Sequence, residues 1–209
     1  MATYSPDTFV LRSSPTSPFV RKVLMAAAVL GVSERLVLQP VDTQDKQDML
    51  IHQNPLGKYP CLVLPSGEAV YGSGVILEFL QTIADDFSLL PTSGQERISL
   101  LTQAGLADGI IDAGALVIYE MRFHGPEKQS TEWIEHQLGK MRRALAAFEK
   151  APPNHSVTNA VTIGLSCALG FLDRRQLLDW RHFCPHLVTW LDAFSMHEPA
   201  FRLTQPPPL

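Results

Sequence analysis

Hydrophobic and polar positions follow two different periods in the first 84 residues, which predicts a mixed α/β arrangement. Runs typical of strands occur at residues 8–12, at 35–41 and, as the two arms of a hairpin, at 60–72. Apolar residues at helical spacing occur at residues 17–31 and 73–84. Pro18 and Gly31 suit the start and the end of the first of these helices. The order strand–helix–strand, then strand–strand–helix, predicts a parallel pair extended by an antiparallel hairpin.

The pattern is helical throughout the second half of the chain. Helices are predicted at residues 97–123, 131–150, 159–172 and 186–196. The third is mostly apolar and is therefore expected at the centre of a helical domain. Asn159 suits the cap of this helix, and the Thr162 hydroxyl is placed to reach back to it. The tail "TQPPPL" is polyproline-like.

Composition places the chain among globular proteins. It has 209 residues, 45% of them hydrophobic and 18% charged, with a formal net charge of -4. The cationic residues are scattered, which argues against a nucleic-acid partner. No uninterrupted apolar run has the length of a membrane span, and the first residues lack the pattern of a secretion signal. Three cysteines without metal-ligand spacing indicate reduced thiols in a cytoplasmic compartment and no metal.

Two short segments stand out as candidate sites. In "NPLGKYPCLVL", Pro60 directly precedes a strand, which indicates either an ordinary rigid turn or a cis-proline that exposes backbone groups to a ligand. In "SPTSPF", Ser17 lies where a helix cap belongs, directly before Pro18. Cys61 follows Pro60 on the strand, and a buried structural thiol is the favoured interpretation.

Several stretches in register resemble the cytosolic glutathione S-transferase family. They are "SPTSPFVRKV", "NPLGKYPCLVL", "GSGVILEFL", "ADGIIDAG", "ALGFLDRR" and "PHLVTWLDAF" followed by "EPAFRLTQPP". The later stretches are similar to a bacterial branch of the family, here with serine at the start of the first helix. The resemblance implies a thioredoxin-like domain at 1–84, a linker at 85–96 and an all-helical domain at 97–209. It also implies a homodimer in the cytoplasm.

The resemblance implies a glutathione site built on backbone groups. In the family the proline corresponding to Pro60 is cis, and the residue before it, here Tyr59, pairs its backbone with the cysteinyl part of glutathione. Ser73, a candidate cap of the next helix, corresponds to the residue that binds the γ-glutamyl carboxylate with its hydroxyl and N–H. The family usually has Glu or Asp just before it, facing the ligand's amino group. Here that residue is Gly72, either a missing anchor or a turn that needs positive φ.

The resemblance also assigns a role to the loop before the first helix. The Ser17 hydroxyl is expected to hold the sulfur of glutathione as a thiolate, with Thr16 and Ser14 as alternatives. Family members with cysteine in this loop typically form mixed disulfides with glutathione. Since "SPTSPF" has no cysteine, thiol addition or substitution is favoured over disulfide exchange.

Candidate residues in the helical domain have two interpretations each. Asp108 and Asp112, four residues apart on one helix face, either reach the ligand's amino group across a dimer interface or face an arginine such as Arg122 or solvent. Tyr119, Arg122 and Phe123 are candidates to line the pocket for a second substrate, and core packing is the alternative for the aromatic positions among them.

The expected function is a glutathione transferase that conjugates glutathione to a small electrophile, or reduces one, as in detoxification. Its expected partners are glutathione, the electrophile and a second copy of the chain, with no membrane. The alternative is a non-catalytic member that binds glutathione or a protein as a regulatory module. A third interpretation is a scaffold whose dimer is the function. No motif identifies the second substrate.

Overall fold

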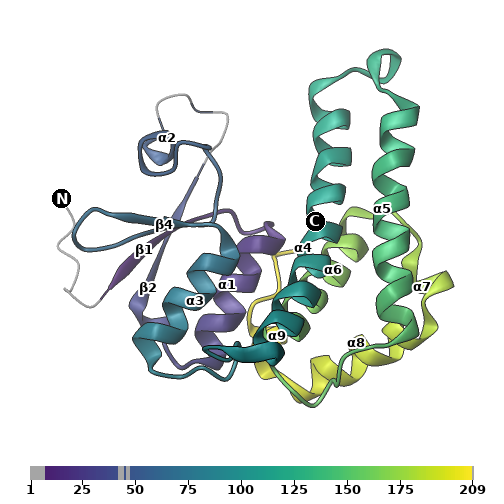
Figure 1. Cartoon of the computed structure of the whole chain (residues 1–209). Helices are drawn as coiled ribbons and strands as arrows, with labels where there is room; N and C mark the ends of the chain where they lie inside the picture. Colours follow the sequence, from purple (N-terminus) through teal and green to yellow (C-terminus); the bar gives the residue numbers. More distant parts are fainter. Residues whose placement is uncertain (1–7, 42–44, 46–47, 209) are drawn as a thin grey trace. The chain divides into compact units, whose positions relative to one another are not determined.

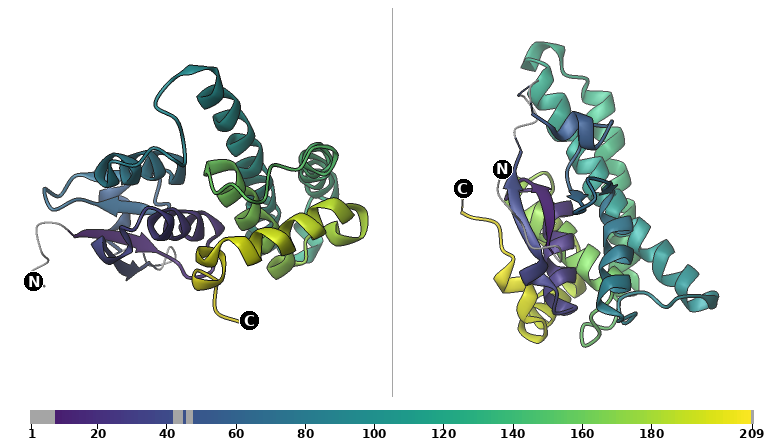
Figure 2. Two further views of the ribbon diagram at one scale, coloured as in Figure 1. Left: turned by 90° about the horizontal axis from the view of Figure 1, so that it is seen from below. Right: turned by 90° about the vertical axis from the view of Figure 1, so that its left-hand side faces the viewer.

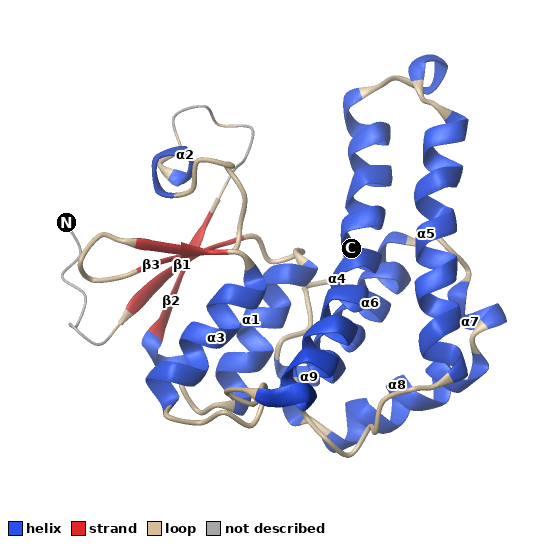
Figure 3. Cartoon of the chain, in the orientation of Figure 1, coloured by secondary structure: helices blue, strands red, loops and turns tan. Residues whose placement is uncertain are grey.

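Strand β1 (Phe9–Ser13) lies inside a four-stranded sheet with the order β2-β1-β3-β4. The computed structural model describes residues 8–41, 45 and 48–208. β2 (Leu36–Pro40) runs parallel to β1, while β3 (Cys61–Val63) runs antiparallel to β1 and pairs with β4 (Ala69–Tyr71). The mixed sheet predicted from the sequence is confirmed (Figure 3).

The two faces of the sheet carry different helices. Side chains alternate along a strand, so Phe9 and Leu11 point to one face and Arg12 to the other. The Phe9 ring meets Phe79 edge-on at 5.3 Å between centroids. Phe79 belongs to α3 (Ser73–Ala84), which packs with α1 (Pro18–Val29) on this face (Figure 1). Arg12 instead bonds to residues at the ends of α2 (Leu50–Gln53), so α2 lies on the opposite face.

The predicted boundaries of the first helix are confirmed. The backbone turns at Ser17, which caps α1, and Pro18 is the first helical residue. Gly31 follows the helix with a φ of 69°, a left-handed conformation that glycine adopts without strain. A 3-10 turn, η1 (Ser33–Arg35), then leads directly into β2. Local sequence signals thus fix the path of the chain from β1 to β2.

The second half of the described chain is helical and contains no strand in the ranges that the structure covers. Its helices are α4 (Gly94–Phe123), α5 (Thr131–Lys150), α6 (Ala160–Arg175), α7 (Trp180–Phe183) and α8 (Pro185–His197), with a 3-10 turn η2 (Pro126–Lys128). α4 and α5 form an antiparallel pair, seen from two further directions in Figure 2. α6 packs on α4 and is buried along most of its length, as its apolar sequence predicts.

The Asn159–Thr162 cap predicted for α6 is confirmed. The Asn159 Oδ1 accepts the N–H of Val161 at 2.9 Å and of Thr162 at 3.1 Å. The Thr162 Oγ1 accepts the N–H of Asn159 at 2.9 Å, which completes a reciprocal capping box.

Contacts divide the chain into two compact units. One consists of residues up to Leu90 together with those from Ala200 onward, and the other of Pro91–Pro199. Helix α9 (Pro199–Leu203) belongs to the first unit from Ala200 onward, where Phe201 packs on Arg21 of α1. The domain boundaries implied by the resemblance, 1–84 and 97–209 with a linker between them, stay a prediction.

One helix in the part of the chain that the structure covers, α4, is long and apolar enough by length and composition to cross a membrane. It packs against α5 and α6 within the second unit. The core helix of a soluble protein meets the same criteria of length and composition.

Candidate glutathione site

Three turns that carry sequence-predicted site residues share one edge of the sheet. Antiparallel pairing places Arg12 of β1 opposite Cys61 of β3, so the turn that follows β1 lies beside the turn that precedes β3. Cys61 is in turn opposite Tyr71 of β4, which leads into α3. The segments 14–17, 59–60 and 72–73 therefore meet at this edge. Backbone topology alone brings together residues that are far apart in the sequence.

Ser17 caps α1 with its side chain. The Oγ accepts the backbone N–H of Val20 at 3.2 Å, and the side chain is buried. The Ser17 N–H donates to the Ser14 carbonyl oxygen at 3.1 Å, which closes a tight turn through Thr16. A hydroxyl that accepts a hydrogen bond keeps its own proton for donation. Ser17 therefore combines a capping role with the capacity to donate to a ligand, while Ser14 and Thr16 lie half-buried in the same turn.

The Tyr59–Pro60 peptide bond is cis. Tyr59 is half-buried and Pro60 is buried. The loop before them is organised by Asn54, a buried residue that the sequence analysis did not single out. Its Nδ2 donates to the Lys58 carbonyl oxygen at 2.7 Å, and its Oδ1 accepts the N–H of Leu56 at 3.0 Å. The signal for this role was present, because an Asn directly before a Pro favours a turn.

Gly72, not Ser73, caps α3, so the prediction of Ser73 as the cap is wrong. Gly72 has a φ of 89°, and its carbonyl oxygen accepts the first helical bond, from the N–H of Ile76 at 3.0 Å. Ser73 is therefore the first helical residue, and no side chain caps the helix. The first N–H groups of α3 point out of the helix at the edge of the sheet, where they suit a carboxylate.

Cys61 lies beside these turns but is a buried thiol, as the sequence predicts. Burial raises its pKa, and the positive charge of Arg12 only partly opposes this. A thiol held neutral and out of contact with solvent is a poor nucleophile. The chemistry of the site therefore has to come from other groups.

The pocket residues proposed on α4 form an exposed cluster on the second unit. Tyr119 and Phe123 have ring centroids 6.1 Å apart, and the Cζ of Arg122 lies 5.9 Å from the Tyr119 ring. All three are exposed, so the alternative of core packing is wrong for Tyr119 and Phe123. Asp108 is half-buried and Asp112 is exposed, and their proposed role across a dimer interface stays a prediction.

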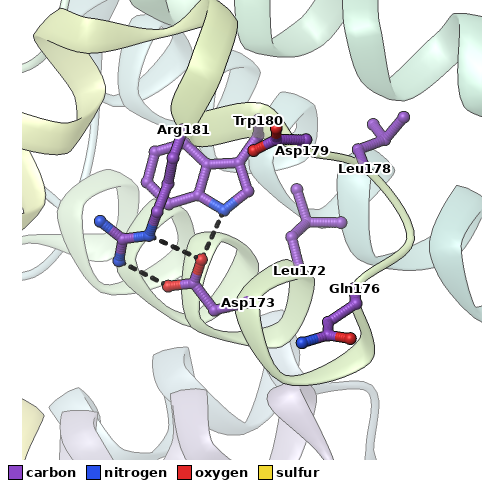
Figure 4. Close-up of a pocket in the computed structure, with 7 residues that line it drawn as sticks. All are labelled: Leu172, Asp173, Gln176, Leu178, Asp179, Trp180 and Arg181. Carbon is purple, nitrogen blue, oxygen red and sulfur yellow. Dashed lines mark hydrogen bonds and ion pairs between the residues drawn. The ribbon is translucent and has the colours of Figure 1, made fainter.

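A pocket of about 320 Å³ lies in the second unit and contains none of the predicted site residues. Figure 4 shows its lining: Leu172, Asp173, Gln176, Leu178, Asp179, Trp180 and Arg181. Asp173 accepts from the Trp180 Nε1 at 2.8 Å and from two Arg181 nitrogens at 2.9 and 2.7 Å. The hydrogen bonds to Asp173 raise the pKa of Arg181. These bonds connect the end of α6 to α7, and both oxygens of the Asp173 carboxylate accept hydrogen bonds from Trp180 or Arg181.

Among the residues that the structure describes, no group of three or more His, Cys, Asp or Glu side chains is arranged to hold a metal ion. The three cysteines are all buried and form no disulfide.

Comparisons with known proteins agree with the arrangement of the first unit. A sequence profile described as "Glutathione S-transferase, N-terminal domain" matches residues 16–83. The "Uncharacterized GST-like protein YibF" of Escherichia coli is 31% identical over 202 residues, which cover 94% of this chain and 98% of that protein.

Solved structures match over nearly the whole chain. A glutathione transferase family member from Pseudomonas fluorescens with bound glutathione is 37% identical, covers 96% of this chain and 100% of its own, and has a TM-score of 0.88. A second structure from that species, with bound S-(propanoic acid)-glutathione, has the same identity and coverage and a TM-score of 0.85. Taken with the helical second unit and the thioredoxin-like first unit, these matches show that the chain belongs to the glutathione S-transferase family.

Proposed function

We propose that the protein binds glutathione at the shared edge of the sheet and holds its sulfur as a thiolate for attack on, or reduction of, a small electrophile. The observation that carries this proposal is the position of Ser17, a buried hydroxyl at the start of α1, beside the turns at Tyr59 and Ser73. Support comes from the relative from Pseudomonas fluorescens that holds glutathione.

The energy available at Ser17 is sufficient for this role. A free thiol has a pKa of about 8.5, so only a few per cent is ionised at neutral pH. Lowering the pKa by two units needs about 2.7 kcal/mol. A hydrogen bond to a charged group contributes about 1.5–3 kcal/mol. The start of α1 adds about 0.3–1 kcal/mol. Thiolate formation therefore requires neither a metal nor a general base.

The remaining contacts would come mainly from backbone groups. The Tyr59 backbone would pair with the cysteinyl part of glutathione in the manner of an added strand, next to Pro60. Ser73, with its hydroxyl and the N–H groups at the start of α3, would bind the γ-glutamyl carboxylate. Gly72 offers no side chain to the ligand's amino group, so Asp108 or Asp112 of a second copy would supply that contact.

The exposed cluster of Tyr119, Arg122 and Phe123 would bind the second substrate, in a homodimer located in the cytoplasm. Its aromatic faces and one cation suit an apolar electrophile with an anionic or electron-rich group. Conjugation is favoured over disulfide exchange because the loop at 14–17 has no cysteine. The S-substituted glutathione bound by the relative from Pseudomonas fluorescens is consistent with an S-linked product.

The test is a pH–rate profile with a standard electrophile for the parent and Ser17→Ala. We expect the alanine variant to raise the pKa of bound glutathione and to lower turnover at neutral pH, with a smaller loss at high pH. Thr16→Ala and Ser14→Ala serve as matched controls in the same turn. A profile unchanged by Ser17→Ala but shifted by either control would assign the sulfur contact to that control residue instead.

A second candidate function, a non-catalytic glutathione-binding or protein-binding member, is favoured by Gly72 at the place of the usual carboxylate. Retention on immobilised glutathione combined with an electrophile assay separates the two. Retention without turnover would support the regulatory function. If neither the parent nor any variant binds or turns over glutathione at millimolar concentration, the proposal of an enzyme is wrong.

A further inference from the structure

The position of Arg12 points to a positioning residue for the candidate site: we infer that it holds α2 and the loop leading to Tyr59 against the sheet. Arg12 lies in the interior strand β1 and is 3% exposed. A buried arginine in the middle of a four-stranded sheet is costly unless its donors are used. This inference deepens the proposed function and rests on it, because the loop that Arg12 holds is part of the proposed glutathione site.

The Arg12 guanidinium bridges the two ends of α2. Its Nη1 donates to Oε1 of Gln53, the last residue of that helix, at 2.8 Å. Its Nη2 forms an ion pair with Oδ1 of Asp48, just before the helix, and both side chains are largely buried. The same Asp48 oxygen accepts the N–H of Leu50 at 2.7 Å. One planar side chain therefore contacts both the entry and the exit of α2, each through a different nitrogen of a rigid fork.

The segment that Arg12 contacts leads directly into the loop before Tyr59. Gln53 is followed directly by Asn54, whose side chain bonds to Lys58 and Leu56 and shapes the loop before Tyr59. A four-residue helix has little stability of its own, since isolated short helices are marginal in water. The bonds from Arg12 tether β1 to Gln53 and Asp48, at the two ends of α2. The position of the Tyr59 backbone therefore depends on a residue that lies outside the proposed binding edge.

Cys61 is a built-in reporter for this segment. It is directly opposite Arg12 in the antiparallel pair, so the two side chains share one face of the sheet. α2 packs on β3 on that face, and Cys61 is fully buried. Release of α2 would therefore expose Cys61, while Cys167 and Cys184, buried in the second unit, would stay protected unless the whole protein unfolds.

The experiment measures alkylation of each cysteine by mass spectrometry in the parent and in Arg12→Met. We expect Cys61 to be labelled at least tenfold faster in the variant, with Cys167 and Cys184 labelled at the parental rate. Gln53→Leu and Arg12→Lys, which each keep part of the bridge, should fall between the parent and Arg12→Met. Labelling of Cys61 at the parental rate in folded Arg12→Met would overturn the inference, whether or not the protein binds glutathione.

Binding of S-methylglutathione, which has no thiol to consume the reagent, tests the consequence for the site. If the loop is correctly placed only a tenth of the time in Arg12→Met, the apparent Kd rises about tenfold. In turnover assays the KM for glutathione should rise similarly, while the pH profile of kcat stays parental because Ser17 is untouched. Faster Cys61 labelling with an unchanged Kd would overturn the positioning role. A parent that does not bind the probe would refute the proposed function, while the Cys61 comparison would still decide whether Arg12 holds α2.

Discussion

Arg21 donates a hydrogen bond from Nη2 to the carbonyl oxygen of Phe201 at 2.8 Å, and its Cζ lies 4.3 Å from the centre of the Phe201 ring. Arg21 follows Ser17 by one helical turn, and its N–H bonds to the Ser17 carbonyl oxygen at 3.0 Å. The segment around Phe201 thus braces the helix that begins at the candidate site. Both residues of the pair are buried, so the cation–π contact is shielded from solvent.

Phe201→Ala should lower the free energy of unfolding by about 3–5 kcal/mol, because it removes a buried ring and its contact with Arg21. Leu203→Ala in the same helix is the matched control. Leu203 is 80% exposed, so its truncation should change stability by less than about 0.5 kcal/mol. Urea denaturation followed by circular dichroism measures both. Equal effects of the two variants would show that the docking of α9 does not stabilise the protein.

Gly72→Ala should destabilise the protein by about 1–3 kcal/mol, because a φ of 89° is strained for any residue with a side chain. A Cβ at Gly72 would meet only Val75, at an ordinary 3.7 Å, so the cost comes from the backbone. Gly74→Ala is the control: it has space around it and an ordinary φ, and it should raise stability by up to about 1 kcal/mol. In thermal melting, a Tm below that of the parent for Gly72→Ala and above it for Gly74→Ala would confirm that the backbone conformation of Gly72 requires glycine.

Gly72→Glu adds the carboxylate that the family usually has, and Gly72→Ala controls for the strain. If an amino-group anchor is missing, Gly72→Glu should bind glutathione roughly tenfold more tightly than Gly72→Ala in titration calorimetry. Equal affinities of the two variants, together with loss of binding in Asp108→Asn or Asp112→Asn, would mean that a second copy already supplies the anchor.

Asn159→Ala should lower the free energy of unfolding by about 1–2 kcal/mol, because two N–H groups at the start of α6 lose their acceptor. The control is Asn154→Ala, in an exposed turn where Oδ1 accepts the N–H of Ser156 at 3.0 Å. It should cost less than about 0.5 kcal/mol. Neither variant should shift the pKa of bound glutathione, which separates loss of a helix cap from loss of the Ser17 hydroxyl.

Cys184 should make stability fall with rising pH. Burial, with the nearby carboxylate of Glu149, raises the pKa of its thiol from 9.0 to about 11. The unfolded chain therefore loses this proton above pH 9, while the folded chain keeps it until pH 11. Relative to Cys184→Ala, the parent should lose about 2–3 kcal/mol between pH 9 and 11. Urea denaturation at several pH values gives the free energy of unfolding of both proteins. A difference between them that stays constant from pH 9 to 11 would contradict the raised pKa of Cys184.

The parts of the fold set by nearby residues could be predicted from the sequence. Pro18 and Gly31 bound α1, and Asn159 with Thr162 starts α6, because each signal acts within one helical turn. The start of α3 could not be assigned in the same way. Gly72 and Ser73 are both acceptable caps, and only the path of the chain from β4 selects positive φ at the glycine.

Contacts between distant segments were not accessible to the same reasoning. Arg12 interrupts an apolar strand, and nothing in its neighbourhood identifies Asp48 and Gln53, 36 and 41 residues away, as its partners. The candidate site is similar in this respect. Ser17, Tyr59 and Ser73 could be named from the family resemblance, while their common edge follows from strand pairing that the sequence alone leaves open.

The Arg21–Phe201 contact also constrains the order of events during protein synthesis. The two residues are 180 positions apart, so at about 5–20 residues per second roughly 9–36 seconds separate their translation. During that interval α1 has emerged without the segment that covers it. A nascent chain therefore exposes to solvent the flank of α1 that Phe201 covers in the folded protein, until the segment of α9 has been synthesised.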